Sequence, residues 1–196
     1  MFGEEYTLVA CADYVLSKTP GNTVSNLSST RALKEVTLRY HKEYEAAAVG
    51  EVNVVQKMKS TNAIIGGEGN GGIIYPENHY GRDALVGIAL FLMLLTERQQ
   101  TVSALRASYP VYFMAKEKIE LSVSLNPDQI LKKLGEKYAD DQCTTIDGLK
   151  IDFEESWVHM RKSNTEPIIR IYTEAKTEAI AQDLAQQFIE EIKATS

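Results

Sequence analysis

The sequence has few of the residues that build metal sites or disulfide frameworks. It contains two cysteines and three histidines in 196 residues. Cys11 and Cys143 are far apart, and neither has a partner at a spacing typical of metal ligands. We therefore expect two reduced thiols in a cytoplasmic protein, and no metal ligand set in this chain.

Positive charge is also scarce. Lys and Arg number 21 against 27 Asp and Glu, which gives a net charge of -6. This balance argues against general binding to nucleic acid or to a membrane surface, and we expect neither partner. An anionic ligand would have to be held by local positive charge, so Arg and Lys that stand among small hydrogen-bonding residues matter most.

No apolar run reaches the length that a membrane-spanning helix needs, about 20 residues. The strongest run, residues 84–95, lies between Arg82-Asp83 and Thr96-Glu97-Arg98. The first five residues place no basic segment ahead of an apolar run, so we expect no secretory signal. We interpret residues 84–95 as part of a buried helix.

Helical and extended patterns alternate over residues 1–107. Expected helices span residues 4–17, 31–41, 52–59 and 84–99, and expected strands span residues 23–27, 44–49, 63–65 and 73–75. Asp83 is the expected N-cap of the last helix. This alternation predicts an α/β layered domain with a mixed sheet.

The pattern changes after Tyr109-Pro110. Asn126-Pro127-Asp128 marks a helix start, and Asp147-Gly148 is a hairpin signal. Further strands are expected at residues 111–123, 144–146, 149–153, 157–160 and 168–172, before an amphipathic helix at 176–193 that buries Ile180, Leu184, Phe188 and Ile192. We predict a smaller α+β domain, an antiparallel sheet covered by two helices, and place the domains at residues 1–110 and 111–196.

Five glycines stand among the seven residues of Gly66–Gly72. Such a loop is costly in chain entropy unless the backbone must turn sharply or approach a ligand closely. Glu68 can accept hydrogen bonds from two vicinal hydroxyls, and Asn70 can both donate and accept. The loop lacks the Gly-Lys-Ser/Thr ending of a P-loop. It suits sugar hydroxyls, or it is a plain turn with Glu68 in solvent.

Arg161–Pro167 is a second polar loop, placed between two expected strands. Arg161 offers a planar fork that suits two phosphate oxygens, and Arg170 adds a second positive charge. The hydroxyl and amide donors of the loop are Ser163, Asn164 and Thr165. The pattern favours a phosphate-binding loop, and the alternative is a solvated hairpin turn.

The two loops together resemble the α-D-phosphohexomutases, which include phosphoglucomutases, phosphomannomutases and phosphoglucosamine mutases. Gly67–Gly71 is similar to their sugar-recognition loop and Arg161–Pro167 to their C-terminal phosphate loop. The segments at 49–58, 79–84 and 147–152 are similar to other parts of their last two domains, in the family's order. The resemblance covers nearly the whole chain and implies domains three and four of a four-domain enzyme.

The resemblance implies an isomerase that interconverts hexose 1-phosphate and hexose 6-phosphate through a bisphosphate intermediate. Its phosphorylated hexose would be held by Glu68, Gly69 and Asn70 through sugar hydroxyls. The phosphate would be held by Arg161, Ser163, Asn164, Thr165 and Arg170. In the full-length family enzyme, Mg²⁺ binds an Asp-rich loop and a hexose 1,6-bisphosphate acts as activator.

Two motifs of the family are absent from this sequence: a Thr-Ala-Ser-His-Asn-Pro-like phosphoserine segment and an Asp-Gly-Asp-x-Asp-Arg-like metal loop. The resemblance therefore implies that domains one and two are missing, with no catalytic residue and no magnesium ligand in this chain. We expect the fragment to be inactive alone. The alternative is a non-catalytic phosphosugar-binding or structural module.

Two positions depart from the family pattern. Asn70 stands where many members have Ser, and members that act on N-acetylated amino sugars can carry Asn in this loop, which favours an amino-sugar phosphate. Glu51 stands where some members have His. It is either a second acceptor for the sugar or an acid in the first turn of a helix. Glucose, mannose and glucosamine phosphates all remain open as substrates.

Overall fold

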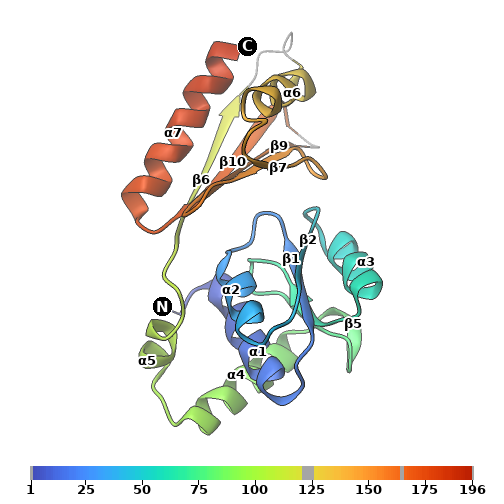
Figure 1. Cartoon of the computed structure of the whole chain (residues 1–196). Helices are drawn as coiled ribbons and strands as arrows, with labels where there is room; N and C mark the ends of the chain where they lie inside the picture. Colours follow the sequence, from blue (N-terminus) through green and yellow to red (C-terminus); the bar gives the residue numbers. More distant parts are fainter. Residues whose placement is uncertain (1, 121–125, 164–165, 196) are drawn as a thin grey trace. The chain divides into compact units, whose positions relative to one another are not determined.

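The computed structural model describes residues 2–120, 126–163 and 166–195. The chain divides into two compact units, Met1–Val111 and Tyr112–Ser196. Each unit has its own five-stranded sheet and its own helices (Figure 1). The two layered architectures confirm the predicted combination of an α/β domain and an α+β domain.

The first unit contains a mixed sheet in the order β2-β1-β3-β4-β5. Strand β1 pairs in parallel with β2 and β3, whereas β3–β4 and β4–β5 are antiparallel. Its elements are α1 (Glu4–Lys18), β1 (Asn22–Asn26), α2 (Ala32–Arg39), β2 (Tyr44–Ala47), α3 (Glu51–Thr61), β3 (Ala63–Gly67), β4 (Ile73–Tyr75), β5 (His79–Arg82), α4 (Ala84–Arg98) and α5 (Val102–Ala107).

Helices cover both faces of this sheet. Val24 on β1 packs with Val54 and Met58 of α3. Its neighbour Thr23 points to the other face, where its hydroxyl lies 2.6 Å from that of Thr37 on α2. Successive strand residues face opposite sides, so a parallel strand with helices on both faces buries nearly all of its side chains.

Helix α4 differs from the expected buried helix. Asp83 caps it as predicted, since its Oδ1 accepts from the backbone N–H groups of Leu85 and Val86 at 2.9 and 3.0 Å. Only one face of the helix is buried, however, and Leu85 and Ile88 are 78% and 56% exposed. No helix within the described residues is long and apolar enough to cross a membrane.

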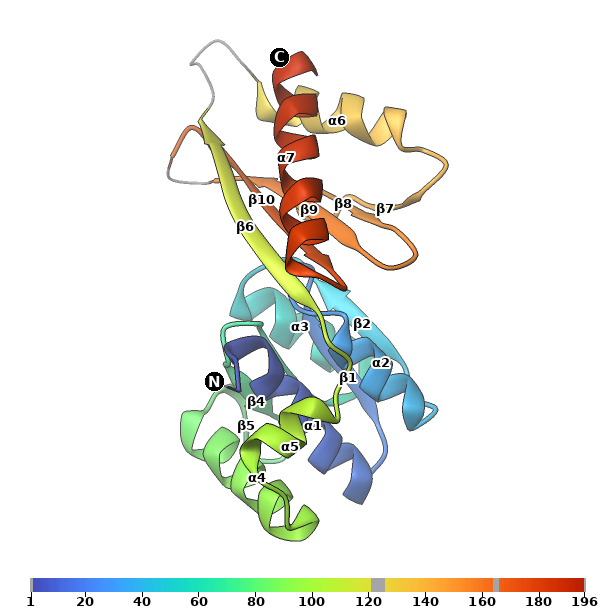
Figure 2. The ribbon, with the colours of Figure 1, turned by 90° about the vertical axis from the view of Figure 1, so that its left-hand side faces the viewer.

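The second unit is an antiparallel sheet in the order β6-β10-β9-β8-β7. Helices α6 and α7 both lie on one face of it (Figure 2). Asn126 caps α6 through the N–H of Asp128, as the Asn-Pro-Asp signal predicts. The elements are β6 (Phe113–Glu120), α6 (Pro127–Lys137), β7 (Gln142–Thr144), β8 (Leu149–Asp152), β9 (Trp157–Lys162), β10 (Ile168–Ala175) and α7 (Glu178–Thr195).

Three details of this unit differ from the sequence prediction. Strand β9 runs on through Arg161 and Lys162, because these residues pair with β10. Strand β7 ends at Thr144, so four residues rather than two join it to β8. Ile180 is 52% exposed, and Ala181 takes the buried position at the start of α7.

Candidate functional site

The glycine-rich loop joins β3 to β4 and is closed by its own backbone. The N–H of Glu68 donates to the carbonyl of Gly72 at 3.2 Å, and the N–H of Gly71 donates to the carbonyl of Glu68 at 3.3 Å. A Cβ atom at Gly67 would lie 2.0 Å from the carbonyl oxygen of Gly72. The close approach of the two ends therefore requires glycine at position 67.

Glu68 is buried, which excludes a plain turn with this side chain in solvent. Its exposed fraction is 7%. Its Oε1 accepts from the side-chain amide of Asn26 at 2.8 Å and from the N–H of Gly50 at 3.0 Å. Oε2 makes no hydrogen bond or ion pair within the part of the chain that the structure describes. One oxygen thus fixes the carboxylate, while the other remains available as an acceptor.

Asn26 and Ser29 complete a ring of hydrogen bonds behind the loop. The Ser29 hydroxyl donates to Asn26 Oδ1 at 2.9 Å and accepts from the N–H of Gly69 at 3.0 Å. Neither residue was predicted from the sequence as part of the site, since both stand about 40 positions earlier in the chain. The ends of parallel strands meet at one edge of the sheet, so the position of Asn26 at the end of β1 was the available signal.

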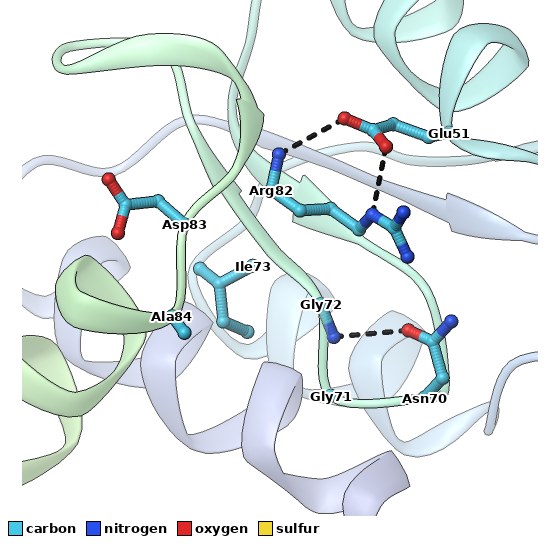
Figure 3. A pocket seen from close by; sticks show the side chains of 8 residues that line it. All are labelled: Glu51, Asn70, Gly71, Gly72, Ile73, Arg82, Asp83 and Ala84. Carbon is cyan, nitrogen blue, oxygen red and sulfur yellow. Dashed lines mark hydrogen bonds and ion pairs between the residues drawn. The ribbon is translucent and has the colours of Figure 1, made fainter.

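Asn70 lies at the tip of the loop and is exposed. Its Oδ1 accepts from the N–H of Gly72 at 3.1 Å, and its NH₂ group makes no bond to the described residues. The loop borders a depression of about 510 Å³ lined by Glu51, Asn70, Gly71, Gly72, Ile73, Arg82, Asp83 and Ala84 (Figure 3).

Glu51 is the first residue of α3, and both its oxygens face Arg82. Oε1 accepts from the backbone N–H of Arg82 at 3.1 Å, and Oε2 accepts from its Nε at 2.8 Å. The backbone bond, followed by the side-chain bond, lowers the pKa of Glu51. Glu51 therefore stays ionised and combines a helix N-terminal position with a place in the pocket.

In the second unit, Arg161 lies near the end of strand β9 rather than in the loop that follows. Lys162 points to the opposite face, where its Nζ bonds Asp128 Oδ2 of α6 at 2.7 Å. The Ser163 N–H donates to the carbonyl of Ile168 at 3.0 Å and closes the hairpin. Asn164 and Thr165, both predicted to bind phosphate, lie outside the described residues.

Arg170 stands directly between two other cations on neighbouring strands. Its Cα pairs with that of Arg161 on β9 and with that of Lys118 on β6. Side chains directly opposite each other share a face, and here it is the face that α6 and α7 leave uncovered. Nη2 of Arg170 lies 3.6 Å from Glu166 Oε2. We call Lys118, Arg170 and Arg161 the basic row.

The basic row has little compensation from acidic groups. Among the described residues, Nε of Arg161 is buried without a hydrogen-bond acceptor, and Lys118 is exposed on its strand. Like charges placed directly opposite each other destabilise a sheet, so an anion bound here would offset an existing cost. Lys118 was missed in the sequence. The available signal was its neighbour Ile119, which packs on the buried face of the sheet. Because adjacent strand residues face opposite sides, Lys118 lies on the other face.

His159 lies beside the basic row on the same strand face and is 1% exposed. Its Nε2 donates to the carbonyl of Asp147 at 2.7 Å. Burial lowers its pKa to about 4, and the positive charges of Lys150 and Arg161 act in the same direction. His159 is therefore neutral near pH 7 and supports the sheet under the cations.

The residues that the structure describes do not form a magnesium site. No group of three or more His, Cys, Asp or Glu within the described ranges could hold a metal ion. The oxygen ligands that Mg²⁺ requires are thus not gathered in this part of the chain.

Comparison with known proteins identifies the family. Residues 3–112 match the model for phosphoglucomutase/phosphomannomutase, alpha/beta/alpha domain III. Residues 111–191 match the model for the C-terminal domain of the same family. The chain therefore belongs to the phosphoglucomutase/phosphomannomutase family, as the two loops predicted.

The similar proteins are longer than this chain. A phosphoglucosamine/phosphogalactosamine mutase from Sulfurisphaera tokodaii is 37% identical over 166 residues, which cover 84% of this chain and 36% of that protein. A probable phosphoglucosamine mutase from Methanopyrus kandleri is 30% identical over 97% of this chain and 42% of that protein. The chain thus spans about two fifths of their length.

A solved structure agrees with the fold. The crystal structure of a phosphoglucomutase/phosphomannomutase family protein from Burkholderia thailandensis has a TM-score of 0.78 and 25% sequence identity to this chain. The match covers 97% of this chain and 41% of that one.

Proposed function

We propose that this chain is the substrate-binding half of a cytoplasmic phosphohexomutase, which interconverts hexose 1-phosphate and hexose 6-phosphate through a bisphosphate intermediate. Residues 1–110 bind the sugar through Glu68, Gly69 and Asn70. Residues 111–196 bind the phosphate through Arg161, Arg170 and the loop that contains Ser163, Asn164 and Thr165. Lys118 joins the phosphate ligands as the third cation of the basic row.

The basic row is the observation that carries this proposal. Its three cations lie side by side, and Arg161 keeps a buried Nε with no acceptor among the residues that the structure describes. A phosphate dianion would supply acceptors to several of these donors at once, and such charge-assisted hydrogen bonds are among the strong ones. A structural module without a ligand would retain the cost of the like charges and gain nothing from them.

Glucosamine phosphate is the substrate we favour, because the S. tokodaii relative is named phosphoglucosamine/phosphogalactosamine mutase and the M. kandleri relative probable phosphoglucosamine mutase. A relative from Thermococcus kodakarensis, 31% identical over 183 residues, is named phosphoglucomutase/phosphomannomutase. Glucose and mannose phosphates are therefore the second choice, to be compared in the same titration.

The phosphoserine, the magnesium ion and its ligands would come from two further domains, and a hexose 1,6-bisphosphate would act as activator. The chain alone should bind substrate without turnover. Calorimetry with glucosamine 6-phosphate should give weak but saturable binding, and a coupled mutase assay with Mg²⁺ and bisphosphate should give no product. Turnover would contradict the proposal that other domains are essential, and absence of binding would favour a structural module.

A further inference from the structure

Arg82 ends strand β5 inside the pocket that Asn70 borders, and its side chain is fixed at one end. The two hydrogen bonds from its backbone N–H and its Nε to Glu51 engage both carboxylate oxygens. A guanidinium is planar, so holding Nε also sets the plane in which its two terminal NH₂ groups point.

Gly72 provides the space for this side chain. A Cβ atom at position 72 would lie 2.6 Å from Cδ of Arg82 and 3.2 Å from its Cγ. The stem of Arg82 therefore lies directly over the last glycine of the sugar loop. Figure 3 shows the guanidinium between Glu51 and Asn70, which both line the pocket.

The two terminal nitrogens of Arg82 donate to no group within the described residues, and the side chain is 49% exposed. Glu51 balances the charge of Arg82, while Asp83 is held by the cap of α4 and by His79, whose Nε2 lies 3.1 Å from Asp83 Oδ2. Two carboxylates and one guanidinium make a poor site for a phosphate dianion. They suit a neutral oxygen that accepts hydrogen bonds.

We propose that Arg82 binds a hydroxyl oxygen of the hexose through its terminal NH₂ groups, beside Asn70, and that Glu51 is the positioning residue that orients it. This inference rests on the function proposed above. It gives different roles to two carboxylates of this unit: Glu68 accepts from sugar hydroxyls, whereas Glu51 acts through the arginine. The pair Arg82 and Asn70 supplies the donors that Glu68 cannot.

The test is binding to the full 196-residue chain labelled with ¹⁵N, followed by NMR. The Nε–H signal of Arg82 is assigned from its loss in Arg82→Met. Three probes are compared: glucosamine 6-phosphate, methyl α-glucopyranoside and inorganic phosphate. We expect the two sugars to shift the Arg82 Nε–H and Asn70 side-chain signals. Inorganic phosphate should shift only the signals of Arg161 and its neighbours.

Arg82→Met should weaken glucosamine 6-phosphate binding about tenfold, the effect of losing one charge-assisted hydrogen bond. It should leave the response of Arg161 to inorganic phosphate unchanged. Gly72→Ala should have a similar effect, because it displaces Arg82 without removing it. Arg39→Met, which removes an exposed arginine at the end of α2, is the matched control.

Glu51→Ala should weaken sugar binding and move the Arg82 Nε–H signal in the free protein. In Glu51→Gln, the sugar affinity and the position of this signal should lie between those of the wild type and Glu51→Ala. If Arg161 still responds to phosphate but Arg82→Met leaves the sugar affinity unchanged, the inference is overturned. A shift of Arg82 with inorganic phosphate alone would make it a phosphate ligand and also overturn it. If no probe shifts either arginine, the proposed function itself fails, and the inference fails with it.

Discussion

Gly148, in the loop between β7 and β8, lies so close to Arg161 on β9 that no side chain fits at position 148. A Cβ atom at Gly148 would lie 2.8 Å from Cα of Arg161 and 2.2 Å from the carbonyl oxygen of Met160. Gly148 also has a φ of +74°, in the left-handed region that favours glycine. The tight end of the β7–β8 hairpin therefore sets the backbone beneath the basic row.

Gly148→Ala should lower the free energy of unfolding by roughly 1–3 kcal/mol from backbone strain alone, with the clash adding to it. Urea unfolding of both proteins measures the difference. Gly135→Ala is the control, since a Cβ there would make only an ordinary contact of 3.5 Å with Leu149. Gly135 lies inside α6, so this change should stabilise by about 0.5–1 kcal/mol. Equal stability of Gly148→Ala and the wild type would contradict the strain argument.

Removal of Arg161 should weaken binding of inorganic phosphate and of hexose phosphate alike. Each charge-assisted hydrogen bond is worth about 1.5–3 kcal/mol, so Arg161→Met should lower affinity roughly ten- to a hundredfold. Lys118→Met should cost less, because an exposed lysine contributes mainly as a point charge.

Lys162→Met is the matched control for that series. Lys162 adjoins Arg161 in the chain but lies on the other face of the sheet, in an ion pair with Asp128. Its loss should change phosphate affinity less than twofold by calorimetry. If Lys162→Met lowered phosphate affinity more than Arg161→Met, the phosphate would bind on the face of Lys162, and our proposal would be wrong.

His159 should make stability depend on pH in one direction. Its folded pKa is about 4, below the value of about 6.5 expected in the unfolded chain. Between these values the unfolded state binds the proton and the folded state does not, so acidification favours unfolding. The contribution of His159 to the free energy of unfolding should fall by about 2 kcal/mol from pH 7.5 to pH 5.

Urea unfolding at pH 7.5 and pH 5 measures this slope in the wild type and in His159→Gln, which should lose it. His41→Asn, an exposed position at the end of α2, controls for the removal of any histidine. Since carboxylates titrate in both proteins, only the difference between the two slopes is informative. Equal slopes would show that His159 is protonated in the folded state as easily as in the unfolded one.

Local patterns predicted most helices and strands, because each follows from spacing and caps within a few residues. Asp83 as an N-cap and Asn126-Pro127-Asp128 as a helix start were correct for that reason. The short elements β5 and α5 were missed. Strand β5 gains its partner only through β4, and α5 has six residues, too few for a clear period.

The site could be predicted only where its residues share a loop. Glu68 and Asn70 were found together, but the groups that hold them were not. Asn26 reaches Glu68 across 42 positions, and Arg82 reaches Glu51 across 31. Such contacts depend on which strands are neighbours in the sheet, and a single sequence carries that information only indirectly. The basic row was predicted only in part for the same reason, because three elements separate Lys118 on β6 from Arg161 on β9.

Asp13 links helices α1 and α4 to the residues that follow α2 and α5, and its loss should strongly destabilise the first unit. Its carboxylate, 7% exposed, bonds Arg98 Nη2 at 2.5 Å and accepts from the hydroxyls of Tyr109 and Tyr40 at 2.8 and 2.7 Å. Asp13→Ala leaves the guanidinium and the Tyr109 hydroxyl without this acceptor, and the Tyr40 hydroxyl with only the backbone carbonyl of residue 13, at 3.2 Å, which should cost about 3–5 kcal/mol.

The exposed ion pair of Lys18 and Glu97 supplies the comparison, because it joins the same helices, α1 and α4, at the same N–O distance of 2.5 Å. Its side chains are 48% and 51% exposed, so water and salt screen the pair, and Lys18→Ala should cost less than about 1 kcal/mol. Urea unfolding of both variants measures how much burial adds to the free energy that an ion pair between these two helices contributes. If Asp13→Ala costs no more than Lys18→Ala, the buried network does not stabilise this packing of helices.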